Sequence, residues 1–441
     1  MTSLSLDAQP ARRPRIVIVG AGFGGLAAAR TLAKAPVDVL LINRTNYHGF
    51  WPLLYQVATA GLEPESIAYP VRAILRRYRN ADFLLAEVRG IDVQRRLVQT
   101  DLGDVTYDYV ILAAGSTTNF FGNERIAHYT MGMKDLNEAQ RLRNHVLLCC
   151  ERAAAETDPA KRAALLTFAV VGGGPTGVEL AGAFVELIRH VIRHDYPMLD
   201  VRQARVVLIE ATDRILASFP DSLQRAALRR LQRMGVEVRL NTPVADADAT
   251  GLRFHNGEQL VAKTVVWAAG VRGAPLADAL GMPLSRGARV PVTPMLTLPA
   301  DERVFVIGDM AYLEGYRPGV AYPMVAPVAI QMGEQAARNI LAHINGQPMQ
   351  PFRYVDKGQM ATIGRSAAVL DAFGIRLSGW LAWVGWLFVH LMALVGFRNR
   401  ALVLLNWAYS YFTYDRGVRL IFGLGAEEQT EELLRQQDLS R

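Results

Sequence analysis

The sequence predicts an α/β protein with two Rossmann-like domains and an amphipathic C-terminal region. Two glycine-rich loops support this fold class, because each lies between a β-branched apolar run and a helical pattern, within residues 15–34 and 168–184. A strand, a glycine turn and a helix in this order are typical of a dinucleotide-binding fold. A third observation concerns the C-terminal region, where the stretch from Gly379 to Phe397 contains no Asp, Glu, Lys or Arg.

The first glycine loop follows an expected strand at residues 16–19 and carries Gly20, Gly22 and Gly25 in Gly-x-Gly-x-x-Gly spacing. The first glycine of such a motif permits the turn, the second lets a pyrophosphate approach the backbone, and the third lets helix and strand pack closely. Unpaired N–H groups at the helix N-terminus then meet the phosphates. The next strand ends in Asn43, where an acid usually holds the ribose, and an asparagine can still hydrogen-bond a diol.

The second glycine loop repeats this spacing with Gly172, Gly174 and Gly177. Its next strand ends in Glu210, which is expected to bind the ribose and to repel a 2′-phosphate, so NADH is favoured over NADPH. Arg214 lies close by in sequence and leaves NADPH as an alternative. One such loop alone could be a plain structural turn, whereas two in order indicate two dinucleotides.

Three further segments extend the pattern. Residues 107–116 and 263–271 each look like a strand that runs into Ala-Ala-Gly, and they are similar to the return strands of two-dinucleotide flavoproteins. Asp309 follows another apolar strand, where in that superfamily an Asp meets the ribityl or phosphate part of FAD, the alternative being ordinary turn chemistry. These similarities predict one FAD and one NADH.

The predicted domain organisation has an FAD domain that is split by an inserted NADH domain. The expected divisions are a tail at 1–14, the FAD domain at 15–123 and 291–347, the NADH domain at 124–290, and a membrane-associated region at 348–441. The tail is polar and has no apolar core of a signal peptide. A chain of 441 residues is long enough for this division.

Cysteine usage and charge limit the electron acceptor and the partners. Residues 46–72, where related disulfide reductases carry a redox pair, contain no cysteine, and the neighbours Cys149 and Cys150 are expected to be buried on a helix. A thiol acceptor and a metal site are therefore excluded. The net charge of +7 suits a nucleic acid or an anionic membrane, and the even spread of the arginines favours the membrane.

Seven motifs together resemble the type II NADH:quinone oxidoreductases, which do not pump protons. They are FWPLLYQVATAGL, GGGPTGVELAG, VWAAGVRG, FVIGDM, APVAIQMGEQAARNI, YVDKGQMATIGR and GFRNRALVLLNWAYSYFTYDRGVRLI, in the family's order between about residues 15 and 422. The last four of these motifs are not general to flavin reductases. The resemblance implies non-covalent FAD, NADH as donor, ubiquinone or menaquinone as acceptor, and a homodimer on the cytoplasmic face of the cell membrane.

The resemblance also implies roles for individual residues. It assigns to FAD the residues Gly20, Ala21, Gly22, Phe23, Gly24, Gly25, Asn43, Arg44, His48, Val88, Gly115, Asp309, Ala326, Pro327 and Lys357. It assigns to NADH the residues Gly172, Gly174, Thr176, Gly177, Glu179, Glu210 and Gly270. Relatives have a glutamine where this chain has Pro327, which lacks an amide donor, so one hydrogen bond to the flavin is expected to be missing.

Glu179, Gln331 and Lys357 are the expected catalytic residues, which would orient the quinone and handle its protons. Without the resemblance, Gln331 and Lys357 would be interpreted as solvated residues at element ends. Glu179 is placed in the first turn of its helix, where the macrodipole alone favours a carboxylate. Because the family places a functional glutamate there, proton delivery or charge balance is the preferred interpretation.

The apolar stretch near the C-terminus is predicted to be one helix that anchors the protein in the membrane interface. Its expected apolar stripe consists of Trp380, Trp383, Val384, Leu387, Leu391 and Leu394. A second amphipathic piece follows, with Arg398, Arg400, Arg416 and Arg419 expected to face lipid headgroups. The alternatives are a membrane-spanning helix, for which about 20 residues suffice, and a buried helix of a dimer interface.

Two other functions remain as alternatives. A membrane-attached NADH sensor would keep both glycine loops but would not need Gln331 and Lys357. A reductase of a soluble electron carrier would not need the apolar C-terminal stretch.

Overall fold

The computed structural model describes residues 12–315, 319–413 and 419–421. Most of the expected tail and Arg416 lie outside these residues. The chain forms two compact units. The first unit contains residues 1–48, 69–117 and 271–357, and the second contains residues 49–68, 118–270 and 358–441.

The first unit is built on a six-stranded sheet whose strands are ordered β20-β21-β9-β1-β2-β5. β1 pairs in parallel with both β2 and β9, as a Rossmann-like sheet requires. The helices of this unit are α1 (Phe23–Leu32), α4 (Val71–Leu75) and α11 (Ala326–Ile344), with 3₁₀ turns η4 (Pro275–Leu280) and η5 (Gly308–Met310). Its strands are β1 (Arg15–Val19), β2 (Asp38–Asn43), β5 (Ala81–Leu85), β6 (Val88–Asp92), β7 (Leu97–Thr100), β8 (Gly103–Thr106), β9 (Tyr109–Leu112), β18 (Val271–Gly273), β19 (Val290–Pro291), β20 (Thr297–Leu298), β21 (Asp301–Val306) and β22 (Ala311–Tyr312).

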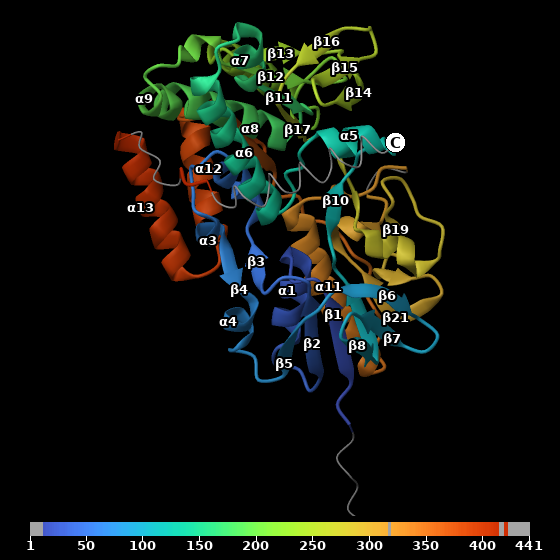
Figure 1. Ribbon diagram of the computed structural model, residues 1–441. Coiled ribbons are helices and arrows are strands. Elements are labelled where there is room, and N and C mark those ends of the chain that lie inside the picture. Colours follow the sequence, from blue (N-terminus) through green and yellow to red (C-terminus); the bar gives the residue numbers. More distant parts are fainter. Residues whose placement is uncertain (1–11, 316–318, 414–418, 422–441) are drawn as a thin grey trace, which may run out of the picture. The chain divides into compact units, whose positions relative to one another are not determined.

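Helices α1 and α11 lie side by side on this sheet (Figure 1). A Cβ atom built on Gly333 of α11 would lie 2.2 Å from the carbonyl oxygen of Gly24 in α1. The two helices therefore cross with backbone against backbone. The core beneath them consists of β-branched and leucine side chains from the parallel strands, such as Ile16, Ile18 and Leu41, which are fully buried.

The second unit is built on a four-stranded parallel sheet, ordered β13-β12-β11-β17. Its helices are α2 (Leu54–Ala58), α3 (Pro64–Ile67), α5 (Glu124–Tyr129), α6 (Leu136–Ala155), α7 (Pro159–Leu165), α8 (Pro175–Glu186), α9 (Arg193–Asp195), α10 (Asp221–Arg233), α12 (Trp380–Ala393) and α13 (Phe397–Thr413), with 3₁₀ turns η1 (Trp51–Leu53) and η3 (Val201–Gln203) and a π-helical segment η2 (Leu187–Ile192). Its strands are β11 (Thr167–Val171), β12 (Arg205–Ile209), β13 (Glu237–Arg239), β14 (Val244–Asp248), β15 (Gly251–Phe254), β16 (Gln259–Val261), β17 (Thr264–Trp267), β23 (Gln359–Thr362), β24 (Ala368–Ala372) and β25 (Ile375–Gly379). The short strands β3 (Tyr47–Gly49), β4 (Ala68–Pro70) and β10 (Ser116–Thr118) lie where the chain passes between units. The predicted α/β class with two Rossmann-like sheets is confirmed.

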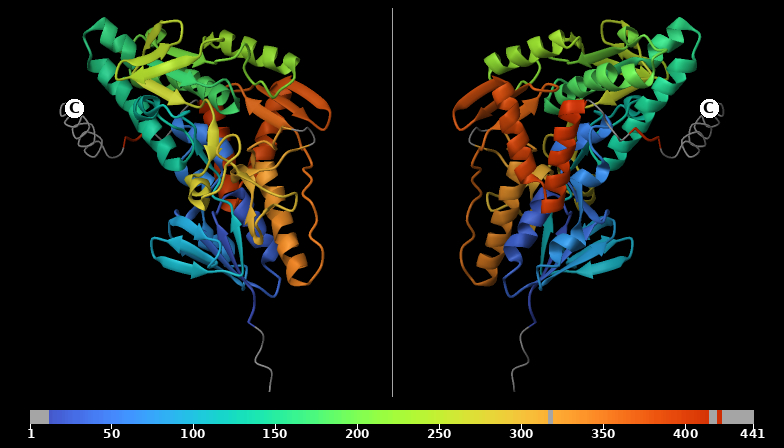
Figure 2. Two further views of the ribbon diagram at one scale, coloured as in Figure 1. Left: turned by 90° about the vertical axis from the view of Figure 1, so that its right-hand side faces the viewer. Right: turned by 90° about the vertical axis from the view of Figure 1, so that its left-hand side faces the viewer.

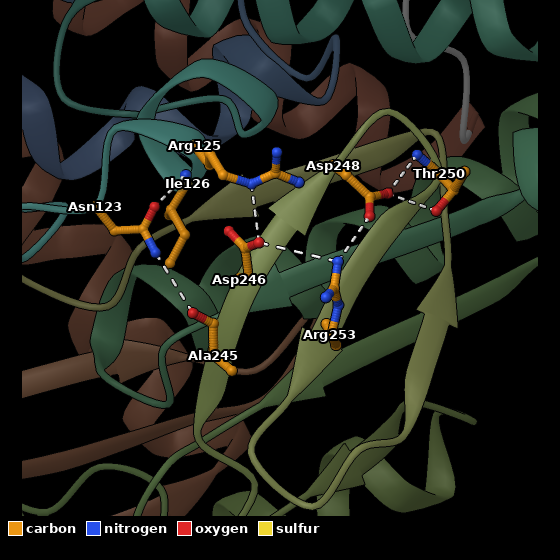
Figure 3. A network of polar contacts seen from close by, with 8 residues as sticks. All are labelled: Asn123, Arg125, Ile126, Ala245, Asp246, Asp248, Thr250 and Arg253. Carbon is orange, nitrogen blue, oxygen red and sulfur yellow. Dashed lines mark hydrogen bonds and ion pairs between the residues drawn. The ribbon is translucent and has the colours of Figure 1, made fainter.

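A surface network of charged residues ties α5 to the β14–β15 hairpin (Figure 3). Asp246 accepts from Arg125 at 2.8 Å, and Arg253 lies 3.4 Å from Asp248. Because these arginines are exposed, the network contributes little to the free energy of unfolding and mainly fixes the position of α5.

The C-terminal stretch forms two helices, so the prediction of one helix from Gly379 to Phe397 is wrong. α12 ends at Ala393, and α13 begins at Phe397 beside it (Figures 1 and 2). The break occurs because Leu394 is extended and Gly396 has a φ of 87°, a conformation that favours glycine. Among the described residues, no helix combines the length and the apolar character that crossing a membrane requires.

Candidate functional site

The first glycine loop has the shape of a phosphate cradle. Gly20 has a φ of 108°, and a Cβ atom on it would lie 2.3 Å from the carbonyl oxygen of Ala113. A Cβ on Gly25 would lie 1.9 Å from the oxygen of Gly20, whereas one on Gly22 would meet nothing within 4 Å. Gly20 and Gly25 therefore allow close backbone packing, and Gly22 leaves open space at the N-terminus of α1, where a pyrophosphate fits.

Asn43 and His48 fasten this loop. Asn43 accepts the N–H of Ala21 through Oδ1 at 3.0 Å and donates to the backbone oxygen of Thr45 at 2.8 Å. Burial lowers the pKa of His48, so its ring is neutral and its Nδ1–H donates to the oxygen of Ala21 at 2.9 Å. The ring of Phe23 contacts the His48 ring edge-on. Of the other predicted FAD residues nearby in sequence, Arg44 is exposed and Val88 opens β6.

Asp309 lies at the turn after β21 and accepts a hydrogen bond from the hydroxyl of Ser116. The preceding residue Gly308 packs against Ala329 of α11, and a Cβ on Gly24 would meet the backbone of Ala329 at 2.9 Å. The glycine loop, the Asp309 turn and the start of α11 thus meet in one place. Gly115, with a φ of 76°, has open space where a Cβ would lie. These features fit an elongated, phosphate-bearing group such as FAD.

The first turn of α11 carries Ala326 and Pro327. They are its first and second residues, after the N-cap Val325. At this position the N–H group has no partner within the helix, so the proline costs no helical hydrogen bond.

Gln331 clamps the segment that leads to Lys357. Its side-chain amide donates to the oxygen of Val355 and accepts the N–H of Val355, both at 2.9 Å. Lys357 follows two residues later and is exposed. Gln331 and Lys357 both belong to the first unit, whereas Glu179 belongs to the second.

The second glycine loop repeats the geometry of the first. A Cβ on Gly177 would lie 1.9 Å from the oxygen of Gly172, and one on Gly174 would meet nothing within 4 Å. Glu210 accepts the N–H of Gly173 at 2.7 Å and the N–H of Thr212 at 2.8 Å. Thr176 is exposed in the first turn of α8, and Gly270 has a φ of 153° after β17.

Arg214 pairs with Asp213 at 2.8 Å and lies 3.9 Å from Asp221. Its charge is thus already opposed by carboxylates, which weakens the alternative of NADPH as the donor.

Glu179 is the fifth residue of α8, because this helix begins at Pro175 with Gly174 as its N-cap. The prediction that it lies in the first turn is therefore wrong, and the macrodipole, which acts over that turn, is not the reason for a carboxylate here. Burial raises the pKa of Glu179 to about 8, and the N–H of Thr362 and the indole of Trp386 act more weakly in the opposite direction. The carboxyl group can therefore hold a proton near neutral pH.

A cavity of about 580 Å³ lies in the second unit between α2, α8, β23 and the helices α12 and α13. Four tryptophans, Trp380, Trp383, Trp386 and Trp407, contribute to its wall. Its polar side chains include Tyr55, whose hydroxyl lies 3.1 Å from Oγ1 of Thr362, and Gln56, which donates to that hydroxyl at 2.9 Å. Trp407 donates in turn to Oε1 of Gln56 at 2.8 Å.

Sequence reasoning did not assign Tyr55 and Gln56, although both lie in the first of the seven quoted motifs. A Tyr-Gln pair within an apolar run was the available signal. Cys149 and Cys150, by contrast, are buried on α6 as expected.

The outer faces of α12 and α13 expose large apolar side chains. They are Trp380, Leu381, Val384, Phe388, Val389, Met392, Phe397, Leu404, Leu405, Tyr409, Tyr411 and Phe412. The predicted stripe does not form a purely outward face, because Leu394 is buried and its other five residues line the cavity. Of the exposed side chains above, Trp380, Val384, Phe388, Leu404, Tyr411 and Phe412 also line the cavity.

Comparisons with known proteins agree with this arrangement. The family model of pyridine nucleotide-disulphide oxidoreductases matches residues 14–333, and the model of the NDH2 C-terminal domain matches residues 357–414. A type II NADH:quinone oxidoreductase of Mycobacterium tuberculosis is 41% identical over 93% of this chain and 90% of the relative. One from Staphylococcus haemolyticus is 30% identical over 83% of this chain and 92% of its own length.

The fold also matches a solved structure of NDH2 from Plasmodium falciparum in complex with NADH. The TM-score is 0.85 at 19% identity, covering 93% of this chain and 100% of that structure. The sequence matches along nearly the whole chain, together with the two glycine loops and the C-terminal domain, confirm the resemblance drawn from the motifs. This protein belongs to the family of type II NADH:quinone oxidoreductases.

Proposed function

We propose that the protein transfers two electrons from NADH through FAD to a membrane quinone that binds in the cavity of the second unit, without pumping protons. The observation that carries this proposal is the composition of the cavity wall. Large aromatic and aliphatic side chains suit the ring and apolar tail of a quinone, and Tyr55 and Gln56 offer hydrogen-bonding groups for a quinone carbonyl.

Bound FAD supplies the two-electron chemistry, since it accepts hydride from NADH and passes electrons to the quinone. The open position at Gly22 and the N-terminus of α1 would hold its pyrophosphate, with Asp309 and Ser116 at the ribityl part. The open position at Gly174 would hold the pyrophosphate of NADH, and Glu210 its ribose. The remaining residues assigned to the two nucleotides from the sequence stay proposals, as do the domain boundaries.

Glu179 would handle a proton of the reduction. Its carboxyl group is desolvated and can be protonated at neutral pH, as a general acid must be. Gln331 would act through Val355, by fixing the segment in which Lys357 lies beside the flavin.

The exposed apolar faces of α12 and α13 would lie in the membrane interface. Side chains such as Leu381, Met392 and Leu405 are exposed outside the cavity, and partitioning them into lipid is favourable. A monotopic attachment on the cytoplasmic face, as a homodimer, is the form we propose, with the exposed Arg398 towards anionic headgroups. Of the other arginines expected there, Arg400 donates to the oxygen of Leu394 at 2.8 Å and Arg419 pairs with Asp195 at 3.2 Å.

A cavity-filling variant tests this function. Ala408 lines the cavity, so Ala408→Trp should raise the KM for a soluble quinone analogue about tenfold or more, while reduction of FAD by NADH keeps its rate. Ala393→Trp is the control, because Ala393 ends α12 outside the cavity. Equal quinone kinetics in both variants would place the quinone elsewhere. Turnover with a soluble protein carrier but not with quinone would favour a carrier reductase.

A further inference from the structure

Glu186 and Glu179 lie two helical turns apart on α8, and both accept hydrogen bonds from the same segment of chain. Glu179 accepts the N–H of Thr362, and Glu186 accepts the N–H of Arg365. A Cβ on Gly182, midway between the two acids, would lie 2.6 Å from the nitrogen of Gly364. Because no side chain separates helix and segment there, the two carboxyl groups have fixed positions.

Glu186 and His190 both line the cavity, unlike the other titratable groups of α8 and η2. Glu186 ends α8, and His190 lies one turn later in the π-helical segment. Such segments are rare and occur frequently at functional sites. The acid and the imidazole therefore reach the cavity directly, whereas Glu179 contacts its wall through the backbone N–H of Thr362.

Tyr55 faces both acids from α2. Burial raises the pKa of its hydroxyl, and the negative charges of Glu179 and Glu186 raise it further. The hydroxyl therefore stays protonated and can pass a proton through its contact with Oγ1 of Thr362 at 3.1 Å. Two positive side chains belong to the segment that Glu186 contacts or bind to it: Arg365, whose guanidinium lies 4.1 Å from the centre of the Tyr411 ring, and Arg230, which donates to the oxygen of Arg365.

Reduction of the quinone needs a supply of protons. NADH gives up a hydride and becomes NAD⁺, whereas the quinone gains two electrons and two protons to become quinol. One proton per turnover must therefore come from water, and Glu179 has to be reprotonated after it has given its own.

We propose that Glu186 supplies this proton to the quinone cavity, with His190 as its connection to water. The proposal rests on the quinone occupying the cavity. Glu186 exchanges a proton with His190 on the outer side and delivers it towards Glu179 and Tyr55 on the inner side.

Glu186→Gln tests the proposal, because an amide oxygen still accepts the N–H of Arg365 but cannot donate a carboxylic proton. We expect steady-state turnover with quinone to fall about tenfold or more above neutral pH, with a larger solvent deuterium isotope effect. Reduction of FAD by NADH should keep its rate. Glu186→Asp should restore most of the turnover. His190→Gln, like Glu186→Gln, should lower turnover with quinone above neutral pH. Glu151→Gln is the control, since that carboxylate lies on α6, accepts a hydrogen bond from the hydroxyl of Tyr196 and does not line the cavity.

Unchanged turnover and isotope effect in Glu186→Gln would overturn the proposal, as would equal losses in the Gln and Asp variants, which would indicate a structural role. If Glu186→Gln fails to bind FAD, the pH profile of turnover in His190→Gln tests the proposal instead. An unaltered pH profile in that variant would refute proton supply through His190 and Glu186. Quinone binding is measured separately by quenching of the cavity tryptophans. Failure of the parent protein to show quenching would contradict the proposed quinone site instead.

Discussion

The backbone N–H of Thr362 donates a hydrogen bond of 3.2 Å to Oε1 of Glu179. This neutral donor favours the ionised carboxylate, but burial outweighs it and raises the pKa to about 8. A carboxyl group in this state can give and retake a proton near neutral pH.

Glu179→Gln should slow quinone turnover by roughly ten- to a thousandfold, on the scale of lost acid catalysis. In the parent protein, turnover should decline as the pH rises through about 8, because the acid form of Glu179 is lost there. The variant should lack this decline. Stopped-flow reduction of FAD by NADH provides the internal control, and an identical pH profile in both proteins would remove Glu179 from the proton path.

Glu179→Gln should also change how stability depends on pH. The folded protein holds a proton on Glu179 up to a pH of about 8, whereas the unfolded chain loses it near the ordinary pKa of 4.5 for a glutamate. Between these values the folded state binds more protons, so the free energy of unfolding falls as the pH rises. Denaturant titrations of FAD-saturated protein at pH 5 and pH 8 should show a smaller fall in the variant. A parallel fall in both proteins would contradict the raised pKa.

Glu210→Gln should narrow the preference for NADH over NADPH, measured as the ratio of the two kcat/KM values. The carboxylate is held by the N–H groups of Gly173 and Thr212, in a position to repel a 2′-phosphate. Glu237→Gln is a matched control at the neighbouring strand, where the carboxylate pairs with Arg205 and Arg239. Equal use of both donors by the parent protein would show that Glu210 does not select NADH over NADPH.

Gln331→Leu should free the segment before Lys357, because it removes both hydrogen bonds to the backbone of Val355. We expect faster amide exchange at Val355 and slower turnover with quinone. Gln335→Leu is the control, since that side chain lies one turn further along α11 and contacts Asn339 and Gln350. Loss of turnover without a change in exchange at Val355 would mean that Gln331 contacts a substrate directly.

Replacing Leu381, Met392 and Leu405 with Ser should weaken attachment to vesicles of anionic phospholipid, because all three are exposed and none lines the cavity. Each large side chain contributes about 1.5 to 3 kcal/mol if it is fully buried in lipid. Leu102→Ser is the control, because Leu102 is equally exposed but lies in the first unit. Co-sedimentation measures the attachment, and undiminished binding of the triple variant would exclude this face as the anchor.

The parts of the fold that could be predicted are those encoded over short stretches. Each glycine loop lies within about 20 residues together with its strand and helix, so spacing alone located both loops. The structure of Gly379–Phe397 was harder to predict, because hydrophobicity does not reveal that Leu394 and Gly396 break the helix. Because Gly174 is the N-cap of α8, Glu179 lies beyond the first turn of this helix. No side chain caps the helix there, so the sequence does not mark where α8 begins.

The cavity could not be predicted, because its wall joins residues that are far apart in sequence. Gln56 and Trp407 share a hydrogen bond across 351 positions, and Tyr55 meets Thr362 across 307. Only the packing of the chain brings such groups together. The surroundings of the predicted apolar stripe could not be predicted for the same reason, since one side of α12 faces this cavity and the other side faces outward.

The crossing of α1 and α11 has a mechanical consequence. α11 is a rod of 19 residues, about 28 Å long at 1.5 Å per residue. Gly333 rests on the backbone of Gly24, with no flexible side chain between them to absorb a displacement. Two residues earlier in the same helix, Gln331 makes two hydrogen bonds with the backbone of Val355. We therefore expect a shift that a bound nucleotide imposes on the glycine loop to displace the stretch of chain that carries Lys357 as well.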